Sequence, residues 1–163
     1  MSIVLFRIDE RLIHGQVVVG WGGQLRPDVF VVVDPGLASS EWEQELYLLG
    51  VPEGAEARFL SPEEARRALP DLRSSPKRAV ILTRNVETML AVARGGTMEG
   101  ESVNLGGLHS QAGRREVLPY LFLDNDDQDR LREISAEGIR VTARDLPGSH
   151  EVPLSELLDR GGR

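Results

Sequence analysis

The sequence predicts an α/β fold, namely a doubly wound, mostly parallel open sheet of about seven strands with helices on both faces. Two observations favour it. Short β-branched or apolar segments alternate with amphipathic segments six times, as strands joined by crossover helices do. Several apolar segments are nearly continuous in Val, Ile and Leu, which is typical of strands covered on both faces. The predicted strands are 3–8, 29–33, 57–60, 78–82, 102–105, 117–123 and 139–142.

Helix boundaries are marked between these strands. Ser40 lies three residues before Glu43, and this spacing is a capping-box signature. Ser61 lies three residues before Glu64 and has Pro62 after it, at the first helical position. Three predicted helices each end directly before a glycine, and these are 41–49, 87–94 and 126–137.

Two segments depart from this regular pattern. The stretch 72–77 contains two serines and a proline, and it is predicted to be a surface loop between a helix and a strand. Pro119 lies inside the predicted strand 117–123, although proline cannot donate a hydrogen bond to a sheet. That strand is therefore expected to begin at Tyr120 or to lie near a sheet edge.

Length and composition restrict the class of protein. A chain of 163 residues is expected to form one domain, 1–163, that buries a core without staples. Its net charge of −7 opposes binding to nucleic acid, and the absence of cysteine excludes disulfides, thiolate metal sites and cysteine nucleophiles. The chain has no signal-peptide pattern and no apolar run of roughly 18 residues. We therefore expect it to meet a membrane only through a partner.

The candidate chemistry follows the first predicted strand, in residues 7–21. His14 lies where the carboxyl end of a strand leads into a helix, which is where parallel sheets bind phosphates. Neutral imidazole is a competent nucleophile toward phosphorus, and Arg7 and Arg11 could neutralise a phosphoryl group. Asp9 could orient the ring or an arginine. The backbone N–H groups expected to cradle the phosphoryl group are those of Gly15, Gln16 and Val17.

Less specific interpretations stay open for the same residues. A single histidine near two acidic residues is often a hydrogen-bonded turn residue, and either arginine could form a surface salt bridge. For Arg7, a surface salt bridge and contact with a phosphoryl group have equal weight. For Arg11, the surface salt bridge has less weight than contact with a phosphoryl group.

A second segment, 104–109, also leaves the carboxyl end of a strand and should border the same crevice. Gly106 and Gly107 permit a close approach of the backbone, and His109 could contact phosphate or a partner. The alternative for His109 is a loop residue without a chemical role. The three histidines show no metal-ligand spacing, so no metal site is predicted.

These two segments resemble a known family. Residues 7–17, Arg-Ile-Asp-Glu-Arg-Leu-Ile-His-Gly-Gln-Val, are similar to the signature of the IIB component of the mannose/fructose/sorbose family of the sugar phosphotransferase system. Residues 103–109, Val-Asn-Leu-Gly-Gly-Leu-His, resemble a second segment of that family. The resemblance extends over almost the whole chain and implies a doubly wound sheet with one edge strand running opposite to the rest.

The resemblance also implies a function. His14 would be the phospho-acceptor of a protein-N(pi)-phosphohistidine–sugar phosphotransferase, which needs no cofactor. It would accept a phosphoryl group from phospho-IIA and pass it to a sugar held by the membrane subunits IIC and IID. The protein would be cytoplasmic, held at the inner membrane only through IIC and IID, and homodimeric. Apolar and aromatic side chains also favour a dimer, and these are Trp21, Trp42, Tyr47, Leu48 and Leu49.

Two alternatives of other classes remain at this stage. A regulatory phosphocarrier would use the same chemistry, but its output would be a binding event instead of sugar uptake. A non-catalytic α/β module would use the motif only to bind an anion. The segment 34–42 resembles the family only loosely, which leaves the partner and the sugar open.

Overall fold

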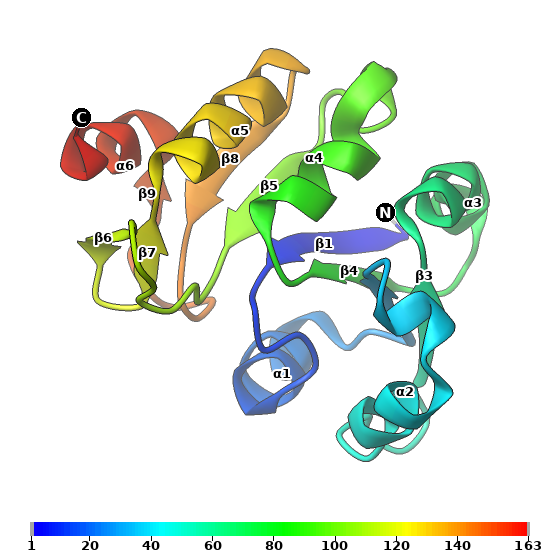
Figure 1. Ribbon diagram of the computed structural model, residues 1–163. Helices are drawn as coiled ribbons and strands as arrows, with labels where there is room; N and C mark the ends of the chain where they lie inside the picture. The colour runs from blue at the N-terminus through cyan, green and yellow to red at the C-terminus, as the bar shows by residue number, and fades with distance from the viewer. Residues whose placement is uncertain (1, 163) are drawn as a thin grey trace.

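The computed structural model describes residues 2–162 and contains a seven-stranded sheet with the strand order β3-β2-β4-β1-β5-β8-β9 (Figure 1). All neighbouring strands are parallel except β8 and β9, which are antiparallel. The predicted doubly wound, mostly parallel sheet is therefore confirmed. The strands of this sheet are β1 Ile3–Ile8, β2 Val29–Val33, β3 Glu56–Leu60, β4 Ala79–Thr83, β5 Ser102–Leu105, β8 Arg140–Ala143 and β9 Val152–Pro153.

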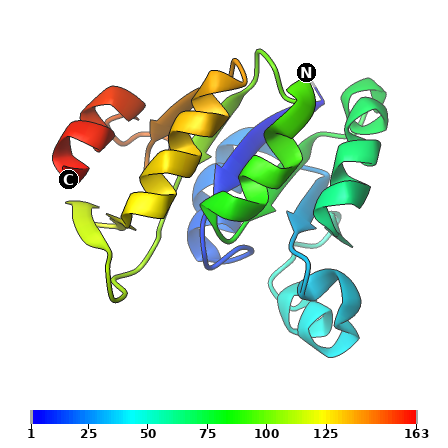
Figure 2. The same ribbon diagram turned by 45° about the horizontal axis from the view of Figure 1, so that its top comes forward.

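Helices cover both faces of the sheet. From β1 the chain moves outward to β2 and β3, and it then returns to β4 and continues past β1 to β5 and β8. Because crossovers are right-handed, this reversal of direction places the later helices on the opposite face. Figure 2 shows α4 and α5 in front of the sheet and α1 behind it. The helices are α1 Gly22–Leu25, α2 Glu41–Leu48, α3 Pro62–Ser74, α4 Val86–Ala93, α5 Asn125–Ala136 and α6 Leu154–Gly161.

Three short helical segments complete the fold. The π-helical η1 (Gln16–Trp21) leads directly into α1, and η2 (Leu37–Ser39) and η3 (Arg94–Gly96) are 3₁₀ turns. No helix within residues 2–162 combines the length and the apolar character that a bilayer crossing requires.

The core consists of two apolar layers, one on each side of the sheet. The larger layer joins α3, α4 and α5 to the sheet through side chains such as Leu69, Met89 and Leu131. The smaller layer packs Leu12 and Val17, from the loop and helix after β1, against β2 and β4. The loop that carries the candidate site is therefore anchored by its own apolar side chains.

Strand register brings the ends of β1, β4 and β5 together. Ile8 pairs with Thr83 of β4 and with Leu105 of β5, and both strands are parallel to β1. The residues that follow these strands consequently leave the same edge of the sheet. This edge is the carboxyl edge, where open parallel sheets bind their ligands.

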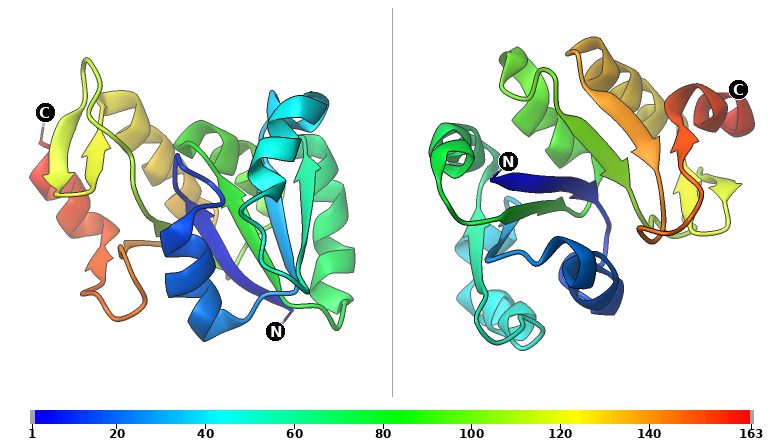
Figure 3. Two further views of the ribbon diagram at one scale, coloured as in Figure 1. Left: turned by 90° about the horizontal axis from the view of Figure 1, so that it is seen from below. Right: turned by 180° about the vertical axis from the view of Figure 1, so that it is seen from behind.

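Predicted strand 117–123 is not a strand of the main sheet, although a strand does begin after Pro119, at Leu121, close to the expected start at Tyr120. Segment 117–123 forms two short antiparallel strands, β6 (Arg115–Leu118) and β7 (Leu121–Leu123), in a separate two-stranded sheet. Pro119 lies in the turn between them, where it does not have to donate to a ladder. Figure 3 shows this hairpin beside α6, away from the main sheet. The seventh strand of the main sheet is the antiparallel edge strand β9, as the family resemblance implies for an edge strand.

One predicted helix boundary and one predicted helix cap also need correction. The predicted loop 72–77 is helical at its start, because α3 extends to Ser74 and buries Leu72. Ser61 and Glu64 form the predicted capping box, whereas Ser40 makes no side-chain cap bond at the start of α2.

Candidate functional site

Asp9, the first residue after β1, is a fully buried carboxylate at the carboxyl edge of the sheet. Its Oδ2 accepts hydrogen bonds from Arg7 Nη2 at 3.1 Å and from the backbone N–H of Gly107 at 3.3 Å. Its Oδ1 accepts from the backbone N–H of Arg11 at 3.1 Å and from Arg11 Nε at 3.3 Å. One carboxylate therefore joins the β1 loop to the β5 loop and holds two guanidinium groups.

Arg7 lies beneath this carboxylate and has no solvent exposure. Its guanidinium donates to the side chain of Asn104 and to the carbonyls of Arg144, at 2.8 Å, and Asp145, at 3.1 Å. The guanidinium carbon also lies 5.1 Å from the centre of the Trp21 ring. Burial lowers the pKa of Arg7, and the charge of Asp9 opposes this effect. The sequence placed Arg7 against the phosphoryl group, but the structure places it in the floor of the site.

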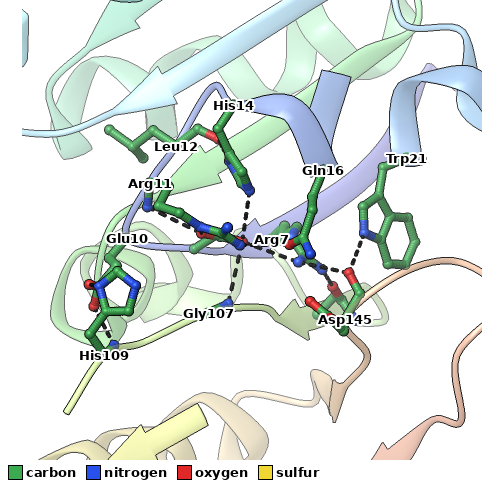
Figure 4. Close-up of polar contacts among 12 residues, drawn as sticks. Arg7, Glu10, Arg11, Leu12, His14, Gln16, Trp21, Gly107, His109 and Asp145 are labelled. Atoms are coloured by element: carbon green, nitrogen blue, oxygen red, sulfur yellow. Dashed lines mark hydrogen bonds and ion pairs between the residues drawn. The ribbon is translucent and has the colours of Figure 1, made fainter. Parts of the chain in front are cut away.

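Arg11 lies at the lip of the site. Its Nη2 donates to Gln16 Oε1 at 2.6 Å while Nε faces Asp9, and 38% of its side chain is exposed. Figure 4 shows the side chains of Arg11, His14 and Gln16 converging above the floor. The carboxylate and the amide hold the guanidinium on one side. Its remaining N–H groups can therefore donate to an anion.

His14 is the candidate nucleophile, and 15% of its side chain is exposed. Its Nδ1 lies 2.8 Å from the carbonyl oxygen of Leu12. Because a carbonyl only accepts hydrogen bonds, Nδ1 carries the proton in this arrangement. The other ring nitrogen, Nε2, is buried without a hydrogen-bond partner and lies 3.7 Å from Asp9 Oδ2. Neither nitrogen therefore presents a lone pair to solvent in this conformation.

The loop between Asp9 and η1 is held in an unusual conformation. Leu12 has a φ of 56°, in the left-handed region that residues with a branched side chain rarely occupy. Its side chain is fully buried in the smaller core layer, so packing stabilises this conformation. Its carbonyl is consequently available to His14. The helix that follows begins with a π-helical segment, and such segments are frequent at functional sites.

The predicted cradle residues Gly15, Gln16 and Val17 differ in their surroundings. Gly15 is the exposed residue that precedes η1, and Gln16 contributes its side chain to Arg11. Val17 is fully buried in the smaller core layer, so only its backbone is relevant to a ligand.

The two glycines after β5 have different roles. A Cβ at Gly106 would lie 2.6 Å from Asp9 Oδ2 and closer still to the Arg7 guanidinium. A Cβ at Gly107 would lie 3.4 Å from Arg11 Nη2, which is ordinary contact. Gly106 therefore permits the floor to pack, whereas Gly107 lies beside the arginine at the lip.

His109 is directed to Glu10 and not to His14 (Figure 4). Its backbone N–H donates to Glu10 Oε1 at 2.7 Å, and its ring pairs with the other carboxylate oxygen. Arg114 donates to the His109 carbonyl at 3.0 Å and also faces Asp127 in α5. Within residues 2–162, no group of three or more acidic and histidine side chains is placed to hold a metal ion.

Sequence reasoning missed a second charged pair at this edge. Arg84 follows β4 and donates from Nε to Asp34 Oδ1 at 2.8 Å, and Asp34 follows β2. The other oxygen of Asp34 accepts from the backbone of Leu37 at 3.0 Å. Asp34 could have been found from the sequence because it directly follows a predicted strand, and Arg84 lies two residues beyond the end of another.

An open parallel sheet with a histidine and a held guanidinium at its carboxyl edge is typical of proteins that handle phosphoryl groups. Residues 3–162 match the family model described as PTS system sorbose subfamily IIB component. The chain is 30% identical over 157 residues to the N-acetylgalactosamine-specific phosphotransferase enzyme IIB component 1 of Escherichia coli strain K12, covering 95% of this chain and 98% of that protein.

Two further comparisons agree with this match. The mannose-specific EIIAB component of Escherichia coli strain K12 is 26% identical over 160 residues, which span 98% of this chain and 49% of that protein. The crystal structure of the N-acetylgalactosamine-specific IIB component 1 from Escherichia coli superposes with a TM-score of 0.83 at 28% identity, covering 92% of this chain and 97% of that one.

The chain belongs to the sorbose subfamily of phosphotransferase system IIB components. It is a sugar-specific phosphocarrier, that is, a protein-phosphohistidine–sugar phosphotransferase. As a IIB component it works with the IIA component and with the IIC and IID components of its system.

Proposed function

We propose that His14 accepts a phosphoryl group from phospho-IIA and passes it to a sugar during uptake. The observation that carries this proposal is the place of the imidazole, at the carboxyl edge beside the Arg11 guanidinium and above the buried Asp9. Residues 1–163 act as one IIB domain in this proposal. The working location is the cytoplasm, against the inner membrane only where IIC and IID hold it.

The first transfer begins with a movement of the His14 ring. Since Nδ1 donates to Leu12 and Nε2 is buried, the ring has to turn before a nitrogen lone pair can reach phosphorus. That lone pair then forms a new P–N bond as the N–P bond of the donor breaks, and the electron pair of the broken bond returns to the donor nitrogen. Transfer to sugar forms a P–O bond as the P–N bond to His14 breaks, the electron pair of that bond returns to the His14 nitrogen, and the hydroxyl proton is released to water.

The surrounding groups position and neutralise the phosphoryl group in both steps. Arg11 supplies N–H donors to the phosphoryl oxygens, and the backbone N–H groups of Gly15, Gln16 and Val17 complete the cradle. Gly107 leaves room for the arginine, as its distance to Arg11 indicates. Arg7 and Asp9 act through Arg11 and the loop, because both are buried beneath them. His109 contacts a partner instead of phosphate, since its ring faces Glu10.

A homodimer stays a prediction. Trp21 is buried within the chain, where its indole donates to the Asp145 carbonyl at 3.0 Å, so it does not support an interface. Trp42, Leu48 and Leu49 are exposed.

Sugar-dependent dephosphorylation tests the proposed function. The protein is phosphorylated with phosphoenolpyruvate, the general phosphotransferase proteins and IIA, and it is then mixed with membranes that contain IIC and IID. We expect the phosphoryl group to leave only when the transported sugar is added, and sugar phosphate to form in equal amount. A phosphoprotein that keeps its label with every sugar, but binds another protein in a label-dependent way, would support the regulatory alternative instead.

A further inference from the structure

Helix α2 leaves an apolar stripe uncovered. None of its residues is buried, and the exposed fractions are 66% for Trp42, 58% for Leu46 and 85% for Leu49 just after the helix. Their spacing of four and three residues puts these three side chains on one face of the helix. A large aromatic side chain with two leucines beside it is an arrangement that marks an interaction surface.

This stripe continues to the histidine loop through a surface hollow of about 460 Å³. Leu46 and Tyr47 of α2 line the hollow together with Ile13, the neighbour of His14, and Glu43 and Arg84 are its charged lining residues. A Cβ at Gly50 would lie 3.5 Å from Ile13 Cγ2, so the end of α2 is packed closely against the loop. Through Leu46 and the hollow, the apolar stripe thus reaches Ile13, the residue before the candidate nucleophile.

The charges around the stripe indicate what could cover it. Glu41, Glu43 and Glu45 flank the stripe on both sides by helical periodicity, and α2 contains no basic residue. A two-fold contact between two copies of α2 would bring these glutamates together, which opposes a homodimer formed through this helix but not one formed through another face. The fitting partner surface is apolar at its centre and carries Lys or Arg at its rim.

The exposure of His14 indicates which partner meets this surface. Because only 15% of the His14 side chain is exposed, a phosphoryl group has to be delivered by a protein seated closely around it.

We propose that the α2 stripe of Trp42, Leu46 and Leu49, together with the hollow beside Ile13, is the docking surface for the phosphohistidine-bearing donor protein. This inference rests on the proposed function and adds to it the part of the chain that selects the donor. Segment 34–48, which runs from the end of β2 through α2, then determines which donor the protein accepts.

Steady-state transfer from the phosphorylated IIA component of the same organism tests the proposal. For the double variant Trp42→Ser/Leu46→Ser, we expect the KM for phospho-IIA to rise at least tenfold while kcat stays within about twofold. Glu43→Lys should raise KM and flatten its dependence on salt. Asp159→Lys makes the same change of charge at an exposed position of α6 and is the matched control, with KM unchanged.

Two further measurements separate the possible failures. Phosphoramidate, a small phosphoryl donor, should label wild type and the double variant equally, because it needs no docking. If neither phosphoramidate nor phospho-IIA labels His14 of the wild type, the proposed function fails. If phospho-IIA labels the wild type and the double variant with the same KM, the docking proposal alone fails.

Other occupants of the stripe give distinct results. A wild-type dimer that becomes monomeric in the double variant, measured by sedimentation at micromolar concentration, would identify a self-interface and overturn the proposal. Unchanged transfer from phospho-IIA, combined with slower sugar-dependent dephosphorylation by membranes, would assign the stripe to the membrane acceptor and overturn it as well.

Discussion

The floor of the site and helix α2 border the same histidine loop but are built in opposite ways. In the floor, Arg7 and Asp9 are fully buried, Arg7 makes several hydrogen bonds to distant parts of the chain, and Asp9 accepts one from the distant Gly107. In α2 no residue is buried, and three large apolar side chains face solvent. The comparison separates buried charges, which hold the geometry of the site, from an exposed helix, to which we assign the choice of donor in our proposal. Substitutions in the two regions should therefore have separable effects.

The largest expected difference concerns stability. Arg7→Met leaves the buried Asp9 carboxylate without its closest guanidinium and removes two bonds to the β8–β9 loop, so we expect unfolding to become easier by about 3–5 kcal/mol. Trp42→Ser in α2 should change stability by no more than about 0.5 kcal/mol. Urea unfolding of both variants measures these changes in the free energy of unfolding. Equal losses of stability would show that the floor and α2 do not differ in their contribution to the fold.

Arg11 should matter more for transfer than for folding. Arg11→Lys keeps the charge but loses the planar group that faces Asp9 and Gln16, so phosphoryl uptake should slow by about 10- to 1,000-fold, or roughly 1.4 to 4 kcal/mol. The melting temperature should stay close to that of the wild type. Rates from phospho-IIA are measured beside thermal unfolding. An unchanged rate would assign Arg11 to the surface, and a collapsed melting temperature would assign it to the fold.

Substitutions of the two glycines after β5 distinguish the buried floor of the site from its lip. Gly106→Ala should destabilise the fold by about 1–3 kcal/mol, because its Cβ would overlap the Arg7 and Asp9 side chains. Gly107→Ala is the matched control, since its Cβ would meet Arg11 Nη2 at an acceptable 3.4 Å. Denaturant midpoints compare the two. Equal stability of both variants would mean that Arg7 and Asp9 can move to accommodate the added methyl group, although both side chains are buried.

The smallest effect is a titration beside the floor. Burial, with a contribution from Asp145, raises the pKa of Tyr120 to about 12, and Arg7 opposes this shift. Since the folded pKa is above the ordinary value of 10.0, Tyr120 contributes stability that is fully present below pH 10.0 and is lost as pH rises through about 12. In a Tyr47→Phe variant, phenolate absorbance should appear near pH 12 in the folded protein. Phenolate absorbance that rises near pH 10 would contradict this prediction.

The sequence predicted much of the fold because its signals are local. The bounds of β1, β2 and β5 agree residue for residue with the predicted strands 3–8, 29–33 and 102–105, which are mostly apolar. Strand β9 has only two residues and follows no apolar run, so nothing in its own sequence marks it. Segment 117–123 looked like one strand because apolar residues flank Pro119, although that proline forms a turn.

Prediction of the site was limited in the same way, because only local sequence signals could be used. The motif placed His14, Arg11 and Asp9 close together in the chain, and the fold keeps them together. The burial of Arg7 depends on carbonyls 137 and 138 residues away, a distance over which spacing carries no information. The Leu12 carbonyl beside His14 depends on a left-handed φ that a leucine does not suggest.

The central claim is that His14 alone carries the phosphoryl group, and intact mass spectrometry tests it most directly. After incubation with phosphoenolpyruvate, the general phosphotransferase proteins and IIA, wild type and His109→Ala should each gain about 80 Da through an acid-labile bond. His14→Ala should gain nothing and should unfold at the wild-type temperature. A gain of mass that persists in folded His14→Ala would contradict the account.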